Sequence, residues 1–277
     1  MRVAVVGHVE WIEFAQVEHV PTPGEIVHAR EWWEEAAGGG GVAAVQLAKL
    51  ADEALLFTAL GDDELGRRSK AELEQRGVRV EAFFRHDQPQ RRGFTFLDGD
   101  GERTITTIHH RYGPHGSDPL PWEKLEETDA VYFVSGDADA LRAARRARVL
   151  VATARSLPVL VEGAVPLDAL VHSSKDAGER YAAGELEPPP RLVVSTAGSS
   201  GGTWTAAEGR SGSFAAAQLP GPVADSYGAG DSFAAGLTFA LGKGLEPGPA
   251  LELAARCGAA NISGRGPYGG QLSAADL

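Results

Sequence analysis

Short β-rich runs alternate with helical patterns of apolar residues along most of the chain. Such an order is typical of βαβ units, in which helices join parallel strands. We therefore predict an α/β protein with a central, mostly parallel sheet flanked by helices. The β-rich runs are Val3 to Gly7, Ala54 to Leu60, Ala130 to Ser135, Val159 to Glu162 and Leu192 to Ser195, and the helical patterns are Val42 to Leu50, Glu64 to Arg76 and Leu141 to Val151.

Two stretches interrupt this alternation, at about residues 12–33 and 79–108. In the second, the turn Asp98-Gly99-Asp100-Gly101 separates the β-rich runs Gly93 to Leu97 and Arg103 to Ile108. An Asp-Gly pair between two β-rich runs is a strong hairpin signal. We expect the strands of both stretches to form a small β-sheet lid, inserted into a single α/β domain that spans residues 1–277.

Composition and charge exclude several classes of protein. With 43% hydrophobic and 23% charged residues, the 277-residue chain has enough apolar material for a large core, which argues against disorder. Lys and Arg total 26 against 38 Asp and Glu, a net charge of -12. This balance argues against nucleic acid and anionic membranes as partners, and it leaves room for a local basic pocket that binds a small anion.

The lone Cys257 excludes an intramolecular disulfide framework and suits a reducing compartment. The N-terminal apolar run from Val3 to Gly7 is too short for a signal peptide and is better interpreted as a first strand. No later segment reaches the roughly 18 uninterrupted apolar residues of a membrane span. We therefore expect a cytoplasmic protein.

The most informative segment is Asp225-Ser226-Tyr227-Gly228-Ala229-Gly230-Asp231, which precedes an amphipathic helical pattern. Its small residues leave backbone N–H groups unobstructed at a helix N-terminus, where unpaired amides and the helix dipole favour anionic oxygens such as those of a phosphate. Asp231 on the first turn can then accept a proton from a hydroxyl beside that phosphate. In the alternative interpretation, Asp231 only stabilises the helix start and the glycines form a turn.

This segment resembles the C-terminal motif of the ribokinase-like (PfkB) carbohydrate kinases, commonly D-T-x-G-A-G-D followed by F-x-x-G. Ser226 stands in place of the Thr, while Phe233 and Gly236 match the last two positions. The resemblance implies a Rossmann-like ribokinase fold with a β-sheet lid, and transfer of the γ-phosphoryl group of ATP to a hydroxyl of a small metabolite. Further segments that resemble the family, in its order along the chain, are Pro21 to Glu25, Leu60 to Gly66 and Asp98 to Thr104.

The resemblance also implies roles for single residues. Asp231 would be the catalytic base, and the amides of Gly228, Ala229 and Gly230 would form an anion hole for the transferring phosphoryl group. Thr196-Ala197-Gly198 resembles the T-x-G turn at the nucleotide phosphates, and the segment Ala259 to Gly264 falls where family members line the adenine pocket. The residues expected to bind ATP are Thr196, Gly198, Asp225 and Asn261.

The substrate-binding stretch departs from the family pattern. Val42 falls where the Asn of the family's G-G-x-x-x-N element would stand, and a valine cannot hydrogen-bond to a sugar hydroxyl. We therefore expect polar recognition of the substrate to differ from the ribose-binding pattern of the family. Ile12 falls at the position of a family Asp, and three alternatives are open: Glu10 substitutes for it, Glu13 does, or neither glutamate faces the pocket. The residues expected to bind the substrate are Glu10, Gly38, Gly39, Gly40 and Val42.

The family's N-x-x-E element, linked to magnesium and phosphate, maps onto Ser173 to Glu179 without its Asn. Asp176 and Glu179 are the candidates to hold Mg²⁺ through water, since this ion keeps several waters and few carboxylates. The alternative interpretation of these two residues is an exposed, charged first turn.

We expect a sugar kinase that uses ATP and Mg²⁺. A nucleoside kinase is the second hypothesis, because Val42, Ile12 and Trp11 can supply apolar and aromatic contacts to a base. The third is a degenerate member that binds a nucleotide or a sugar without phosphorylating it. The resemblance further suggests a homodimer formed through the lid.

Overall fold

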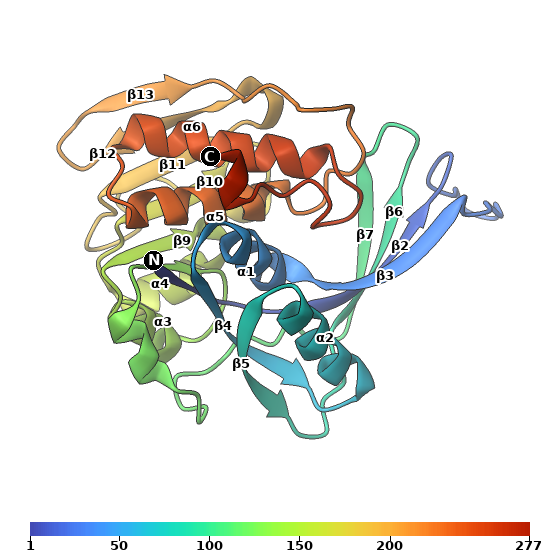
Figure 1. The fold of residues 1–277 in the computed structure, drawn as a ribbon, viewed down its shortest axis with the longest axis horizontal. Coiled ribbons are helices and arrows are strands. Elements are labelled where there is room, and N and C mark those ends of the chain that lie inside the picture. The colour runs from blue at the N-terminus through green and yellow to red at the C-terminus, as the bar shows by residue number, and fades with distance from the viewer.

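Two β-sheets organise the computed structural model, which describes residues 1–277 (Figure 1). The strands are β1 (Arg2–Val6), β2 (Glu10–Gln16), β3 (Glu31–Ala37), β4 (Glu53–Gly61), β5 (Val78–Arg85), β6 (Arg92–Leu97), β7 (Arg103–Ile108), β8 (Ala130–Phe133), β9 (Val149–Thr153), β10 (Ala169–Ser173), β11 (Leu192–Thr196), β12 (Gly202–Ala206) and β13 (Ser211–Phe214). The helices are α1 (Gly38–Leu50), α2 (Glu64–Gln75), α3 (Ala138–Ala144), α4 (Leu157–Gly163), α5 (Ala229–Gly242) and α6 (Pro247–Ile262).

The large sheet has nine strands in the order β13-β12-β11-β10-β9-β8-β1-β4-β5. All neighbours from β11 to β5 pair in parallel, and β12 and β13 complete one edge as antiparallel strands. The predicted α/β fold with a mostly parallel central sheet is confirmed.

The central strands are buried on both faces, as the continuous apolar run of β1 predicts. Val3 and Val5 belong to the core cluster that includes residues of α1, α5 and α6. Ala4 and Val6 point to the opposite face and belong to the second core cluster, with residues of α3 and α4. The helices thus cover the sheet on both sides.

The small sheet has the order β3-β2-β6-β7 and projects from one side of the body, so the predicted lid sheet is present (Figure 1). It is joined to the body without long linkers, because β2 begins at Glu10 soon after β1 ends, and β3 ends at Ala37, directly before α1. Its boundaries differ from the predicted ones. The β5 strand lies within the predicted second stretch, yet it pairs with β4 in the large sheet.

Two of the predicted segments have a different structure. The helix predicted for Leu141 to Val151 ends at Ala144, and Val149–Thr153 forms β9. A short apolar run that is buried on both sides has no periodicity to separate a strand from a helix. Val159 to Glu162 was predicted as a β-rich run but lies in α4, where Pro158 occupies the first turn and favours helix initiation.

None of the helices combines the length and the apolar character that crossing a membrane requires.

Candidate active site

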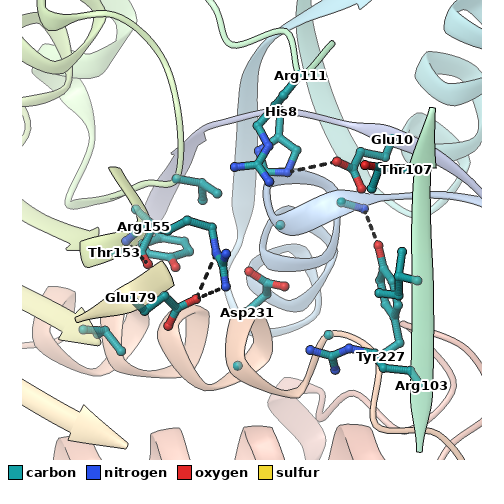
Figure 2. Close-up of a pocket in the computed structure, with 18 of the residues that line it drawn as sticks. His8, Glu10, Arg103, Thr107, Arg111, Thr153, Arg155, Glu179, Tyr227 and Asp231 are labelled. Atoms are coloured by element: carbon teal, nitrogen blue, oxygen red, sulfur yellow. Dashed lines mark hydrogen bonds and ion pairs between the residues drawn. The ribbon is translucent and has the colours of Figure 1, made fainter. Parts of the chain in front are cut away.

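A cavity of about 330 Å³ lies between the carboxyl ends of the parallel strands and the small sheet (Figure 2). In open α/β sheets this end of the strands is the usual place for ligands. The start of α1, the start of α5 and strand β7 complete its walls. Its lining residues are His8, Glu10, Gly38, Gly39, Arg91, Arg103, Ile105, Thr107, Arg111, Tyr132, Val134, Thr153, Arg155, Val171, Glu179, Thr196, Tyr227, Gly228, Gly230 and Asp231.

The N-terminus of α5 opens into this cavity. Gly228, the residue before the helix, has φ +81°, a left-handed conformation that favours glycine. No side chain caps the helix, so its first N–H groups lack a capping partner. Gly228 and Gly230 both line the cavity, and together with Ala229 they present the small-residue turn that the sequence predicts.

The Asp231 carboxylate lies at the base of the cavity, against the first turn of α1. A Cβ atom added to Gly39 would lie only 2.9 Å from Asp231 Oδ1. Gly39 therefore has to lack a side chain for α1 to approach this carboxylate. The structure thus brings together a residue expected at the substrate and the residue expected to be the base.

Burial raises the pKa of Asp231 to about 6, and the negative charge of Glu179 acts in the same direction. The guanidinium groups of Arg103 and Arg155 act in the opposite direction on this pKa. The carboxylate is therefore ionised near neutral pH and is a stronger base than an aspartate in water.

Hydrogen bonds inside the protein fix the conformation of residues 225–228. The buried Asp225 carboxylate accepts hydrogen bonds from the backbone N–H of Tyr227, at 2.8 Å, and from that of Gly266, at 3.1 Å. The Tyr227 hydroxyl in turn accepts a hydrogen bond from the Gly38 N–H at 3.2 Å. Asp225 is not among the cavity-lining residues, so it positions the turn and does not face a ligand there.

The residues predicted for the substrate occupy different places. Glu10, Gly38 and Gly39 line the cavity, whereas Gly40 and Val42 do not. Gly40 packs against the chain after β1, where its N–H donates to the His8 carbonyl oxygen at 3.0 Å. Val42 is fully buried and packs beneath Gly228.

Glu10 and Glu13, the two candidates for the acidic position on β2, lie three residues apart, so their side chains point to opposite faces of the strand. Glu10 reaches the cavity, where its carboxylate accepts from Arg91 Nε at 2.5 Å. Glu13 pairs with Arg92 and does not line the cavity. Ile12 is fully buried and Trp11 is only 2% exposed, so neither side chain presents an apolar face to a ligand.

Of the residues expected to bind nucleotide, Thr196 lines the cavity at the end of β11, and its hydroxyl donates to the His172 carbonyl oxygen at 3.2 Å. Gly198 follows in an exposed turn with φ +61°, beside the ammonium group of Lys175. Asn261 lies elsewhere: it is fully buried, and its amide nitrogen donates to the Pro267 carbonyl oxygen at 2.8 Å.

A second cavity of about 410 Å³ lies between the β12–β13 edge and α6, and it is mostly apolar. Phe214 in its wall stacks on Phe233, which is two residues after Asp231 on α5. The cavity therefore adjoins the first turn of α5. Its lining residues are Trp204, Ser213, Phe214, Ala215, Ala216, Ala217, Gly248, Leu251, Glu252, Ala255 and Arg256.

The two candidates for magnesium, Asp176 and Glu179, both form ion pairs with Arg155. Asp176 is exposed, and its second oxygen accepts from the Gly178 N–H, so both of its oxygens are engaged. Glu179 lines the cavity and contacts Arg155 through Oε1. No group of three or more His, Cys, Asp or Glu side chains forms a ready metal cage.

Four arginines in the cavity wall received no role from the sequence: Arg91, Arg103, Arg111 and Arg155. Only Arg103 had a local signal, since it stands in the segment Asp98 to Thr104 that resembles the family. Arg91 and Arg111 lie in separate loops and Arg155 lies in a short 3-10 helix after β9, and no local pattern reveals that the three meet at the cavity.

The family model for pfkB family carbohydrate kinases matches residues 1–160 and 167–274. The chain belongs to this family. The match covers the glycine-rich start of α1, the small sheet and the α5 turn that together form the cavity. As a pfkB kinase, the protein is a phosphotransferase with an alcohol group as acceptor.

Solved structures of other kinases share the fold over nearly the whole chain. A putative ribokinase from Agrobacterium tumefaciens is 21% identical, with a TM-score of 0.82, and the match covers 99% of this chain and 95% of that one. Ribokinase from Arabidopsis thaliana, complexed with ribose and ATP, is 18% identical with a TM-score of 0.76, over 97% and 95% of the two chains. Adenosine kinase from Sinorhizobium meliloti is 20% identical with a TM-score of 0.77, over 99% and 97%. No curated protein matches the chain by sequence.

Asp231→Asn is expected to stabilise the folded protein at pH 8 and to have little effect at pH 4. The pKa of Asp231 is raised from 3.8 to about 6 in the folded protein. Ionisation of this carboxylate therefore destabilises the fold, by an amount that increases between these two pH values and is constant at higher pH. An uncharged amide removes that cost, about 1–3 kcal/mol in the free energy of unfolding. Urea denaturation at both pH values measures it, and an equal loss of stability at the two would contradict the shift.

Proposed function

We propose that this kinase transfers the γ-phosphoryl group of ATP to a hydroxyl of a sugar, with Asp231 as the base. The observation that carries the proposal is the juxtaposition of the Asp231 carboxylate with the uncapped N-terminus of α5 at one end of the cavity. A proton acceptor and a binding site for anionic oxygens are the two elements that this reaction requires.

In the proposed step, the acceptor hydroxyl oxygen forms a bond to the γ-phosphorus while the bond from phosphorus to the β,γ-bridging oxygen breaks. The hydroxyl proton passes to Asp231, and ADP leaves with the bridging oxygen. The raised pKa of Asp231, about 6, suits a carboxylate that must be ionised and still basic at neutral pH.

The negative charge on the transferring group is stabilised by the amides of Gly228, Ala229 and Gly230. Arg103, which has no carboxylate partner and lowers the pKa of Asp231, adds positive charge at the same place. Arg155 also lowers this pKa, but its charge is paired with Asp176 and Glu179. Phosphoryl transfer demands little covalent chemistry from a protein, so positioning and charge neutralisation supply most of the catalysis.

We assign the nucleotide phosphates to the end of β11, beside Thr196 and Gly198. Lys175 supports this assignment, because its ammonium group lies beside the Gly198 turn. For the adenine base, the second cavity with Phe214 and Leu251 in its wall is better suited than Asn261, whose amide is already engaged inside the protein. An apolar slot is the usual environment for a planar base.

Mg²⁺ belongs to the proposal as the companion of ATP. Of the two candidates, Glu179 fits better, because it lines the cavity and its Oε2 has no partner in the protein. We propose that it holds the ion through water, while the phosphates supply the direct ligands. The bound ion would neutralise charge on the phosphate oxygens.

A nucleoside is less well supported as acceptor. The side chains suggested for stacking on a base, Trp11, Ile12 and Val42, are buried away from the cavity. Polar and charged groups dominate the lining instead, which favours an acceptor rich in hydroxyls.

A homodimer through the lid remains a proposal. It is supported by exposed apolar side chains on the small sheet. Ile26, in the connection between β2 and β3, is 86% exposed, and Trp32 on β3 is 58% exposed. We also propose a cytoplasmic location, because the co-substrate ATP is abundant there.

Asp231→Asn is expected to reduce turnover by about 10²–10⁴-fold, because the amide cannot accept the hydroxyl proton. ADP release from Mg-ATP is measured across a panel of sugars and nucleosides, with wild type beside the variant. Unchanged turnover in the variant would remove Asp231 as the base. Absence of turnover in wild type, with ATP binding retained, would favour the non-catalytic alternative.

Gly39→Ala is expected to reduce turnover by at least about tenfold, because the new methyl group would meet Asp231 Oδ1 at 2.9 Å and displace it. Gly41→Ala in the same helix is the matched control, since its nearest neighbour would be the Tyr268 hydroxyl at an ordinary 3.6 Å. Initial rates and circular dichroism of both variants test this. Equal rates would show that the approach of α1 does not position the base.

The rate at saturating substrates is expected to rise with pH through about 6 and then to level off, as Asp231 loses its proton. The groups that set this pKa are Glu179 and Glu10, which raise it, and Arg103 and Arg155, which lower it. Arg103→Gln should therefore move the acidic limb to higher pH. A limb that moves to lower pH would contradict the assignment.

A further inference from the structure

The cavity gathers positive charge in a chain of net charge -12. Its wall contains four arginines and no lysine, against the three carboxylates of Glu10, Glu179 and Asp231. Arginine guanidinium groups match the geometry of carboxylate and phosphate oxygens. The contacts of each arginine show which of them is available to a ligand.

Two of the four are neutralised by carboxylates of the protein. Arg155 pairs with Asp176 and Glu179. Arg91 pairs with Glu10. These pairs account for the charges of both arginines within the protein itself.

Arg103 has no carboxylate partner but lies next to the catalytic turn. One of its nitrogens donates to the Ser226 carbonyl oxygen, and the guanidinium lies over the Tyr227 ring at 5.8 Å. This position suits the transferring phosphoryl group, as proposed above.

Arg111 is the remaining cation, and it has no hydrogen bond or ion pair to any protein group. It lies on the connection after β7, beside His8, at the end of the cavity away from Tyr227 and Arg103 (Figure 2). Arg111 lines the same cavity as Glu10 and Asp231. Burial lowers the pKa of Arg111, and the carboxylates of Glu10 and Asp231 act in the opposite direction on this pKa. The pKa of the neighbouring His8 is lowered well below its usual value by burial and by Arg111, so this side chain stays neutral and adds no competing charge.

The segment that carries Arg111 is held in place. Arg91, besides pairing with Glu10, donates from Nη1 to the His109 carbonyl oxygen at 3.1 Å, two residues before Arg111. The Glu10–Arg91 pair therefore positions the connection and leaves the Arg111 guanidinium without a partner of its own.

An unpaired guanidinium is a poor match for a neutral sugar. A hydroxyl offers it a single weak acceptor, whereas a carboxylate or phosphate offers two charged oxygens in a bidentate arrangement. Partial burial among other arginines also disfavours the charge of Arg111, a cost that a bound anion offsets.

We infer that the acceptor is an acidic sugar, whose carboxylate or phosphate binds Arg111 while one of its hydroxyls lies at Asp231. This inference rests on the proposed kinase function and specifies its substrate class.

The test is equilibrium binding to wild-type protein without nucleotide, by calorimetry, so that no turnover is needed. The probes are D-gluconate and D-galactonate as sugar acids, and D-fructose 6-phosphate and D-glucose 6-phosphate as sugar phosphates, each beside its uncharged sugar. We expect at least one acidic class to bind ten or more times more tightly than its uncharged counterpart. Which class does so identifies the carboxylate or the phosphate as the group bound.

The variants separate Arg111 from general electrostatics. Arg111→Gln should weaken binding of the acidic probe at least tenfold and leave uncharged sugars within about twofold, while Arg111→Lys should retain part of the preference. Arg210→Gln removes the same charge from an exposed site that pairs with Glu208, and should change neither. In ADP-release assays Arg111→Gln should raise the KM for the acidic acceptor and leave the KM for ATP unchanged.

The outcomes distinguish this inference from the proposed function. Asp231-dependent turnover of uncharged sugars, with no preference for acidic ones, would overturn the inference alone. Arg111-dependent binding of an acidic sugar, with no Asp231-dependent ADP release from any sugar of the panel, would contradict the proposed function and leave the anion site standing. Failure of every acidic probe to bind at 10 mM, or an effect of Arg111→Gln only on the KM for ATP, would also overturn the inference.

Discussion

The site depends on two chain segments that meet without side chains between them. A Cβ atom on Gly40 would lie 2.5 Å from the His8 carbonyl oxygen, and one on Gly7 would lie 3.0 Å from the Gly40 Cα. Because both positions are glycine, the start of α1 packs directly on the end of β1. The same approach carries Gly39 to the Asp231 carboxylate, so α1 and α5 converge from opposite ends of the chain. Glycine here is a packing requirement, which no larger residue satisfies.

A second constraint is electrostatic. The body contributes Asp231, Glu179, Arg155 and the catalytic turn, while the small sheet and its connections contribute Glu10, Arg91, Arg103 and Arg111. Three of the four arginines of the cavity thus come from the lid side, and the raised pKa of Asp231 comes mainly from its burial in the body. Neither half alone would both hold anionic oxygens and accept a proton beside them.

Local signals explain what the sequence predicts well. The alternation of β-rich runs and helices predicts the large sheet, and Asp98 to Gly101 predicts the β6–β7 turn, because both depend on neighbours in the sequence. The α5 turn is recognisable for the same reason. Long-range packing explains the remainder. Val149–Thr153 is a strand because it is buried on both faces. The Asn261 side chain donates a hydrogen bond to the Pro267 carbonyl oxygen inside the protein. Arg111 becomes part of the cavity only when the connection after β7 folds over the body.

The direct passage of β3 into α1 has a mechanical consequence. Ala37 ends the strand and Gly38 begins the helix, so no linker residue separates the small sheet from the cavity wall. The Gly38 N–H is in turn bonded to Tyr227 beside the α5 turn. Any rotation of the small sheet relative to the body must therefore displace a backbone group of the cavity wall. The angle between the two sheets and the shape of the acceptor site are therefore coupled through this backbone group.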